Sequence, residues 1–251
     1  MNLPLSKSIS NRLLIIKALS GEKTASAGIS DSDDTYMLFN GLRTKSDTVD
    51  VGHAGTSMRF LTAYFAATAQ AKIITGSARM QERPIRDLVD ALNQLGADIQ
   101  YLGKEGFPPV QTSGKKLFGN AVHINGNISS QFITALLLIA PTLPKGLTIH
   151  INGELVSESY IKMTLKLMLQ AGVSANIDRQ TIVVAAQKYS AAGIECERDW
   201  SAASYWYEIA ALANDANIQL PGITADSLQG DAVIARIFAQ LGVETVFCNG
   251  G

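Results

Sequence analysis

The stretch Pro4-Leu5-Ser6-Lys7-Ser8-Ile9-Ser10-Asn11-Arg12 runs directly into an apolar segment, 13–19, which Gly21 follows. This spacing predicts a helix that ends on glycine. The serines, the lysine and the arginine then lie at the helix start, where unpaired backbone N–H groups and a partial positive charge favour anions. The added hydroxyl and cationic donors predict a phosphate site. Taken alone, the stretch also fits a serine cap with solvated basic neighbours.

Composition limits the classes of protein that the chain can represent. A length of 251 residues fits one large domain or two, and 47% apolar residues supply a buried core. The formal net charge of −1 argues against a nucleic-acid partner, so any anion site must be built locally. Cys196 and Cys248 match no metal or disulfide spacing. We expect no metal, no cofactor, no signal peptide and no membrane span, and hence a cytoplasmic protein.

Polar clusters recur where loops enter expected helices. The pattern predicts helices over 58–68, 85–95, 132–140 and 161–171, and a loop over 76–83. Five groups of anion-binding side chains lie at such junctions: Ser6/Lys7/Ser8, Thr56/Ser57/Arg59, Arg79/Arg83, Ser129/Ser130/Gln131 and Ser157/Tyr160. Each alone is an ordinary cap, but five in one chain favour a function in anion binding.

A helix-end pattern also repeats along the chain. Apolar helices end on glycine before a strand at Gly96, Gly172 and Gly242. These intervals are too long for a solenoid repeat. They predict repeated α/β units, each made of two helices and several strands.

The combined motifs resemble those of the enolpyruvyltransferase family, over essentially the whole chain. The resemblance rests on Leu3-Pro4-x-Ser6-Lys7-Ser8-x-Ser10-Asn11-Arg12, Asp31-Ser32-Asp33-Asp34, Ala54-Gly55-Thr56-x-Met58-Arg59, Arg79-Met80-x-Glu82-Arg83-Pro84-Ile85, Ser129-Ser130-Gln131-Phe132, Glu154-Leu155-Val156-Ser157-x-x-Tyr160, Asp199-x-Ser201-x-Ala203-Ser204-Tyr205 and Gln229-Gly230-Asp231.

The resemblance implies an α/β fold of repeated βαβαββ units, arranged as an inside-out α/β barrel, with the start of a second similar domain. Residues 5–198 are then expected to form a shikimate 3-phosphate-binding domain, and residues 199–251, with 1–4, an incomplete part of the second. Members of the family are expected to be much longer. Their remaining part carries the proton-transfer carboxylates and further cations, so the chain is expected to be truncated at its C-terminus and inactive alone.

The implied reaction transfers the enolpyruvyl group from phosphoenolpyruvate to the 5-hydroxyl of shikimate 3-phosphate, in chorismate and aromatic amino acid biosynthesis. By resemblance, the residues that bind shikimate 3-phosphate are Lys7, Ser8, Arg12, Ser129, Ser130, Gln131, Ser157 and Tyr160. Those on the phosphoenolpyruvate side are Lys7, Gly55, Arg83 and Gln131. Lys7 lies between the substrates as a charge clamp and proton donor, and is the expected catalytic residue.

Some assignments stay open at this stage. Arg59 and Arg79 fit either the site or the scaffold, while Asp33, Asp34 and Asp199 fit caps or ion-pair partners. A relative acting on a UDP-sugar is one alternative, although its expected Lys-Asn pair and reactive loop cysteine are not evident. A noncatalytic ligand-binding module is the other. In either case small molecules, and no nucleic acid or membrane, are the expected partners of a monomer.

Overall fold

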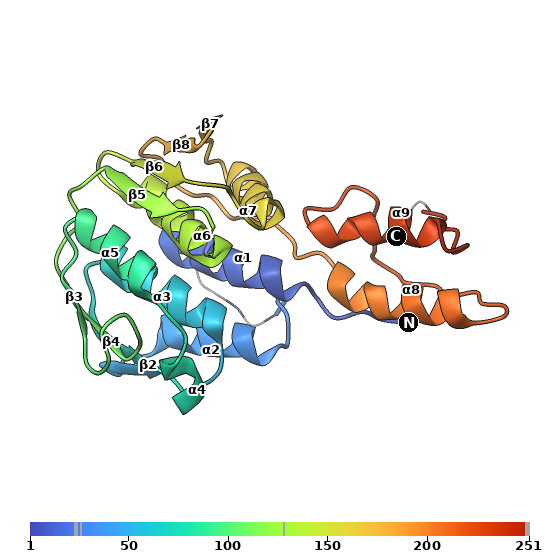
Figure 1. Cartoon of the computed structure of the whole chain (residues 1–251), viewed down its shortest axis with the longest axis horizontal. Coiled ribbons are helices and arrows are strands. Elements are labelled where there is room, and N and C mark those ends of the chain that lie inside the picture. The colour runs from blue at the N-terminus through green and yellow to red at the C-terminus, as the bar shows by residue number, and fades with distance from the viewer. Residues whose placement is uncertain (23–24, 26, 128, 249–251) are drawn as a thin grey trace.

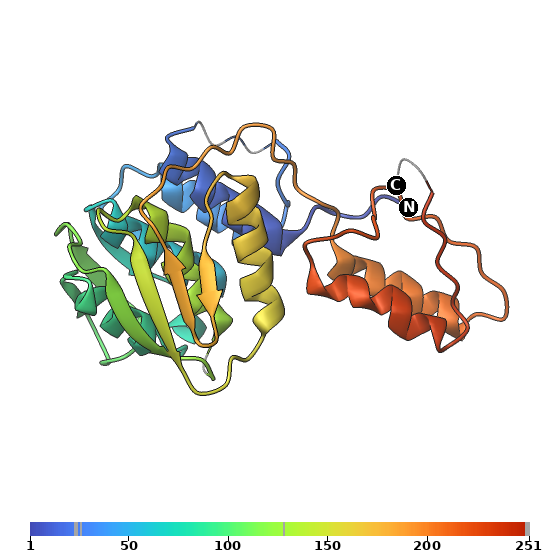
Figure 2. The same cartoon turned by 90° about the horizontal axis from the view of Figure 1, so that it is seen from above.

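The computed structural model describes residues 1–22, 25, 27–127 and 129–248. It has a large lobe and a small lobe, and the N-terminus and the last described segment of the chain both lie on the small lobe (Figures 1 and 2). Among these residues, none of the helices combines the length and apolar character needed to cross a membrane.

Two four-stranded sheets in the large lobe share one topology. The first has the order β1-β2-β4-β3 and the second β5-β6-β8-β7. In each, the first two strands are parallel and the remaining pairs are antiparallel. The strands are β1 (Thr48–Asp50), β2 (Ala71–Thr75), β3 (Ile99–Tyr101), β4 (Val110–Ser113), β5 (Ala121–Asn125), β6 (Leu147–Asn152), β7 (Asn176–Asp178) and β8 (Thr181–Val184).

Helices connect the strands in the same places in both sheets. In the first unit α3 (Gly55–Ala67) joins β1 to β2, and α5 (Arg86–Gln94) precedes β3. In the second, α6 (Ser130–Ile139) joins β5 to β6, and α7 (Glu158–Gln170) precedes β7. Both units are therefore βαβαββ, which confirms the repeat that the glycine pattern and the resemblance predicted.

α3 and α6 lie inside the large lobe, with the two sheets on its outside (Figure 1). Residues 9–16 of α1 (Lys7–Ser20) and 132–139 of α6 are all buried. A helix that is apolar on all sides must be surrounded by protein. By contrast, β5 alternates strictly between exposed and buried residues, so one sheet face packs on the helices and the other meets solvent.

Two helix boundaries differ from the sequence pattern. α3 begins at Gly55, three residues before the predicted start at Met58, and its cap residue Ala54 has no polar side chain to signal it. A short helix, α4 (Ala78–Gln81), stands in the predicted loop because the Ser77 hydroxyl accepts a hydrogen bond from Met80 N. α2 (Asp33–Arg43) carries two acids in its first turn, where they complement the positive end of the helix dipole.

The small lobe has a core of its own. It contains α8 (Trp200–Leu212), the 3₁₀ turn η2 (Gly230–Val233) and α9 (Ile234–Ala239). Its buried apolar residues are Leu3, Trp200, Ala203, Tyr207 and Ile223.

Two chain segments cross side by side between the lobes. Leu5 and Arg198 form an antiparallel bridge. Beside it, Ser6 N donates to the Glu197 carbonyl at 2.8 Å, and Asp199 N donates to the Pro4 carbonyl at 3.0 Å. The start and end of the large lobe are thus hydrogen-bonded to each other.

Candidate functional site

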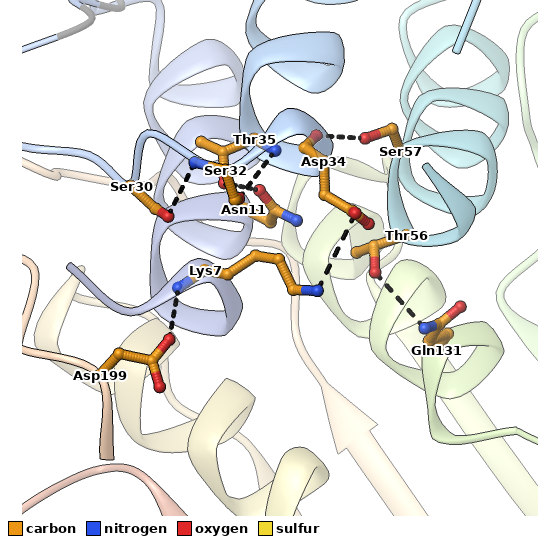
Figure 3. Close-up of polar contacts among 10 residues, drawn as sticks. All are labelled: Lys7, Asn11, Ser30, Ser32, Asp34, Thr35, Thr56, Ser57, Gln131 and Asp199. Atoms are coloured by element: carbon orange, nitrogen blue, oxygen red, sulfur yellow. Dashed lines mark hydrogen bonds and ion pairs between the residues drawn. The ribbon is translucent and has the colours of Figure 1, made fainter. Parts of the chain in front are cut away.

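The first turns of four helices meet at one end of the large lobe (Figure 3). Lys7 Nζ of α1 lies 3.9 Å from an Asp34 carboxylate oxygen of α2. The Ser57 hydroxyl of α3 donates to the Asp34 carbonyl at 2.7 Å, and Gln131 Nε2 of α6 donates to Thr56 Oγ1 at 3.4 Å. The positive ends of four helix dipoles therefore converge, which favours an anionic ligand.

Lys7 stands at the centre of this arrangement with its side chain 48% exposed. Its separation from Asp34 is an ion-pair distance but longer than a hydrogen bond, so the ammonium donors remain available to a ligand. On the other side, the Asp199 carboxylate accepts from Lys7 N at 3.4 Å and caps α8 through Ser201 N and Ala202 N. Both aspartates thus act as the cap and ion-pair partners that the sequence allowed.

Arg12 is a buried cation that only neutral groups surround. Its Nε donates to Thr164 Oγ1 at 2.8 Å, Nη1 to the Ser8 carbonyl at 2.7 Å, and Nη2 to the Tyr160 carbonyl at 3.4 Å. The rings of Tyr160 and Phe60 lie within 6 Å of the guanidinium, at 5.8 and 5.9 Å. Within the described residues no carboxylate forms an ion pair with it.

Burial has an electrostatic consequence for Arg12. Desolvation lowers the pKa of the guanidinium to about 10, which still leaves it protonated at neutral pH. A buried charge without a counter-ion is unfavourable, and an anion bound beside it compensates that cost. The contacts to Ser8 and Tyr160 place this charge between the starts of α1 and α7.

Gly55 and Arg83 lie against each other at the start of α3. A Cβ added to Gly55 would overlap Arg83 Nη1. Behind them, Arg59 is buried and donates to the Gly55 carbonyl at 3.0 Å and to the Pro84 carbonyl at 2.8 Å. Arg59 therefore belongs to the scaffold that supports Arg83. Arg79 lies on the surface, where it pairs with Glu82 at 2.7 Å.

Burial and the neighbouring charge of Arg83 also affect Arg59. Desolvation, and then repulsion by the second guanidinium, lower the pKa of Arg59 to about 10. The two neighbouring guanidinium groups of Arg59 and Arg83 therefore give the start of α3 a positive potential.

The serines of α6 and α7 are used differently. The Ser129 hydroxyl caps α6 by accepting from Gln131 N at 3.3 Å, while Ser130 is the first helical residue and partly exposed. Ser157 precedes α7 in the left-handed conformation, with φ of 56°, and its hydroxyl makes no cap hydrogen bond. Tyr160 is 38% exposed. Ser130, Ser157 and Tyr160 are therefore accessible to a ligand at the helix starts.

Two contacts of Arg12 are absent from the sequence prediction. Thr164 bonds Arg12 across 152 residues of sequence, and Phe60 lies beside the same guanidinium. A helical threonine and a buried phenylalanine carry no local signal of such a role, because both contacts arise only when α1, α3 and α7 pack together.

Fold and site together define an α/β protein whose converging helix starts are suited to small anionic ligands. Comparison with known families then specifies the family. The family described as EPSP synthase (3-phosphoshikimate 1-carboxyvinyltransferase) matches residues 41–247. The chain belongs to this family.

Named relatives agree with that assignment. A 3-phosphoshikimate 1-carboxyvinyltransferase of Bacteroides fragilis (strain YCH46) is 48% identical over 252 residues, and one of Shewanella pealeana is 40% identical over 273 residues. These matches cover 100% and 97% of this chain, and 62% and 64% of the relatives. The chain thus spans less than two thirds of their length.

A solved structure supports the fold. The EPSP synthase of Acinetobacter baumannii superposes with a TM-score of 0.76 at 20% identity, covering 96% of this chain and 59% of that one. The mixed α/β fold predicted from the sequence is confirmed.

Proposed function

We propose that this chain forms the shikimate 3-phosphate-binding part of an enzyme that transfers the enolpyruvyl group from phosphoenolpyruvate to the 5-hydroxyl of that substrate. The observation that carries the proposal is the convergence of helix starts around Lys7 and the buried, uncompensated Arg12. A sugar-like ring bearing a phosphate supplies both the counter-ion and the hydroxyls that such a site can bind. Membership of the EPSP synthase family supports the choice of substrates.

The proposed binding groups divide by helix. Lys7, Ser8 and Arg12 of α1 hold shikimate 3-phosphate together with Ser129, Ser130 and Gln131 at α6 and Ser157 and Tyr160 at α7. Gly55 and Arg83 face phosphoenolpyruvate, with Lys7 and Gln131 shared between the substrates.

In this proposal the chain's residues act mainly by neutralising and positioning two polyanions. The 5-hydroxyl oxygen gives up its proton and bonds to C2 of phosphoenolpyruvate while a proton is added to C3. The tetrahedral intermediate then loses phosphate from C2 and a proton from C3, which restores the C2–C3 double bond. We assign to Lys7 the roles of bridging the two substrates and of donating the proton that is added to C3. The reaction requires neither oxidation nor reduction, so no cofactor is assigned.

The two lobes correspond to the proposed division into domains. Residues 5–198 form the shikimate 3-phosphate-binding domain, and residues 199–251 with 1–4 belong to the second; residues 249–251 lie outside the described part. Separate apolar cores on the two sides of the crossing support this division. We also propose a cytoplasmic monomer, because the proposed substrates are small metabolites.

Binding to the 251-residue chain tests the proposal. We expect shikimate 3-phosphate to bind with a Kd on the order of 10–1000 μM, which corresponds to about 4–7 kcal/mol. Affinity should fall as salt rises, because a half-open site leaves its charges exposed to screening. Calorimetry and NMR at two ionic strengths measure both effects, and signals of Ser8, Arg12, Ser130 and Tyr160 should shift.

Controls separate this proposal from its alternatives. Phosphoenolpyruvate alone should bind at least tenfold more weakly, since the resemblance assigns it further ligands outside this chain. A UDP-sugar should leave the Arg12 and Tyr160 signals unchanged. The assignment would be refuted if phosphoenolpyruvate alone bound as tightly as shikimate 3-phosphate. It would also be refuted if the NMR signals of Arg12 and Tyr160 did not shift with shikimate 3-phosphate.

A further inference from the structure

Two histidines lie directly opposite each other on the outer face of the second sheet. His123 of β5 and His150 of β6 are register partners in a parallel pair. The flanking residues Val122, Ile124, Ile149 and Ile151 point inward and are buried. Because side chains alternate along a strand, both imidazoles point outward, away from the helices.

The imidazoles are already close and aligned. Their ring centres lie 4.7 Å apart, and their planes are inclined by 19°. Two imidazoles bonded to one ion at about 2.0–2.1 Å have ring centres about 4.5–5 Å apart, so the backbone spacing already fits a shared ion. Rotation about the second side-chain torsion, which is soft for histidine, directs both Nε2 atoms to one point.

A third residue fixes which nitrogen of His150 faces outward. Thr181, the register partner of His150 on β8, places its hydroxyl 3.4 Å from His150 Nδ1. A hydrogen bond at Nδ1 leaves Nε2 as the nitrogen for a ligand, the arrangement that second-shell groups give to metal-binding histidines.

We propose that His123 and His150 chelate a divalent ion of the zinc, nickel or copper class through their Nε2 atoms. Imidazole suits these ions, whereas magnesium and calcium prefer oxygen ligands. No group of three or more candidate ligands occurs in the described chain, so water completes the coordination and the ion exchanges readily. The bound ion links β5 to β6 and thereby stabilises the second βαβαββ unit. This site is independent of the proposed transfer reaction.

Zinc and nickel titrations of the purified chain test the proposal. The sequence contains three histidines, so His53→Gln is a matched control. All variants should carry Cys248→Ser, because Cys248 is an exposed thiol that also binds these ions. We expect one equivalent of Zn²⁺ to bind, with at least a tenfold loss of affinity in His123→Gln and in His150→Gln and no change in His53→Gln.

Two further readouts show where the ion sits. Paramagnetic Ni²⁺ should broaden NMR signals of residues 121–125 and 148–152, and Zn²⁺ should raise the melting temperature only when both histidines are present. Unchanged melting of the metal-free variants shows that they still fold. One-to-one binding that survives His123→Gln/His150→Gln, or no binding at 1 mM Zn²⁺, would overturn the proposal.

Discussion

The guanidinium of Arg83 rests on the backbone of Gly55, in the space that a side chain at position 55 would fill. A Cβ there would overlap Nη1 and Nη2 of this guanidinium. Gly55 is the first residue of α3 and does not adopt a positive φ. The glycine is therefore required by its neighbour and not by its own backbone conformation.

The first prediction follows from this contact. Gly55→Ala should leave the melting temperature nearly unchanged, since alanine suits a helix, but should displace Arg83. The loss of a charged hydrogen bond, worth roughly 1.5–3 kcal/mol, should raise KM for phosphoenolpyruvate about tenfold or more. Steady-state kinetics on a full-length enzyme carrying this sequence measure it. KM for shikimate 3-phosphate serves as the control, and an unchanged KM for phosphoenolpyruvate contradicts the proposed role of Arg83.

Lys7 and Ser8 provide a second, paired test. Lys7 is the exposed cation between four helix starts, whereas Ser8 contributes one neutral hydroxyl. In a full-length enzyme, Lys7→Met should lower kcat/KM much more than Ser8→Ala, because charged hydrogen bonds are worth roughly 1.5–3 kcal/mol and neutral ones about 1. Lys7→Arg keeps the charge and should recover part of the binding but less of the turnover. Equal losses of kcat/KM in Lys7→Met and Ser8→Ala would show that Lys7 is only a solvated residue beside the helix cap.

Replacing Arg12 should affect stability little and substrate binding strongly. Since the buried guanidinium has no carboxylate partner, Arg12→Met should cost little stability while abolishing measurable shikimate 3-phosphate binding. Denaturant unfolding and calorimetry on the same samples give the two quantities. Phe60→Leu is a useful control, because it alters the wall beside Arg12 without removing a charge. Retention of full affinity in Arg12→Met would exclude an ion contact.

The lowered pKa of Arg12 also predicts a pH dependence of stability. The native state loses this proton near pH 10 and the unfolded chain only at higher pH, so the unfolded state binds more protons in that interval. The contribution of Arg12 to the unfolding free energy should therefore rise from about pH 10 upward and be flat from pH 6 to 9. The difference in unfolding free energy between wild type and Arg12→Met, measured across pH 6–11, isolates this contribution. A slope within pH 6–9 would show that another group is responsible.

The two cysteines should differ in reactivity. Burial raises the pKa of the Cys196 thiol, while Cys248 is exposed. Because the thiolate is the reactive form, iodoacetamide at pH 8 should alkylate Cys248 within minutes and leave Cys196 unmodified until the chain unfolds. Peptide mass spectrometry, with and without urea, measures the extent of alkylation at each cysteine. Rapid labelling of Cys196 in the native chain would mean that the crossing between the lobes opens.

Local signals in the sequence predicted the elements well. The glycine after α1 and the repeated helix ends identified several helices and the βαβαββ repeat, because caps and periodicity are local. The start of α3 and the helix α4 were missed: Ala54 offers no capping side chain, and the Ser77 cap lies among glycine and charged residues.

The candidate site was predictable only in part. Lys7, Ser8 and Arg12 lie in one stretch, and their position at a helix start could be read directly. The pairing of Arg12 with Thr164, and the contact of Arg83 with Gly55, depend on the packing of helices far apart in sequence. No pattern within one sequence specifies such contacts.

The bridge between Leu5 and Arg198 gives the large lobe the architecture of an inserted cassette. A chain that enters and leaves a structure at adjacent points can be lifted out or transplanted without disturbing the order of what remains. New termini opened elsewhere in the lobe, with the two crossing segments joined by a short linker, would keep every internal contact. The same closure means that a force pulling on the small lobe reaches the large one through two adjacent hydrogen-bonded segments, together with the neighbouring contact between α7 and η2.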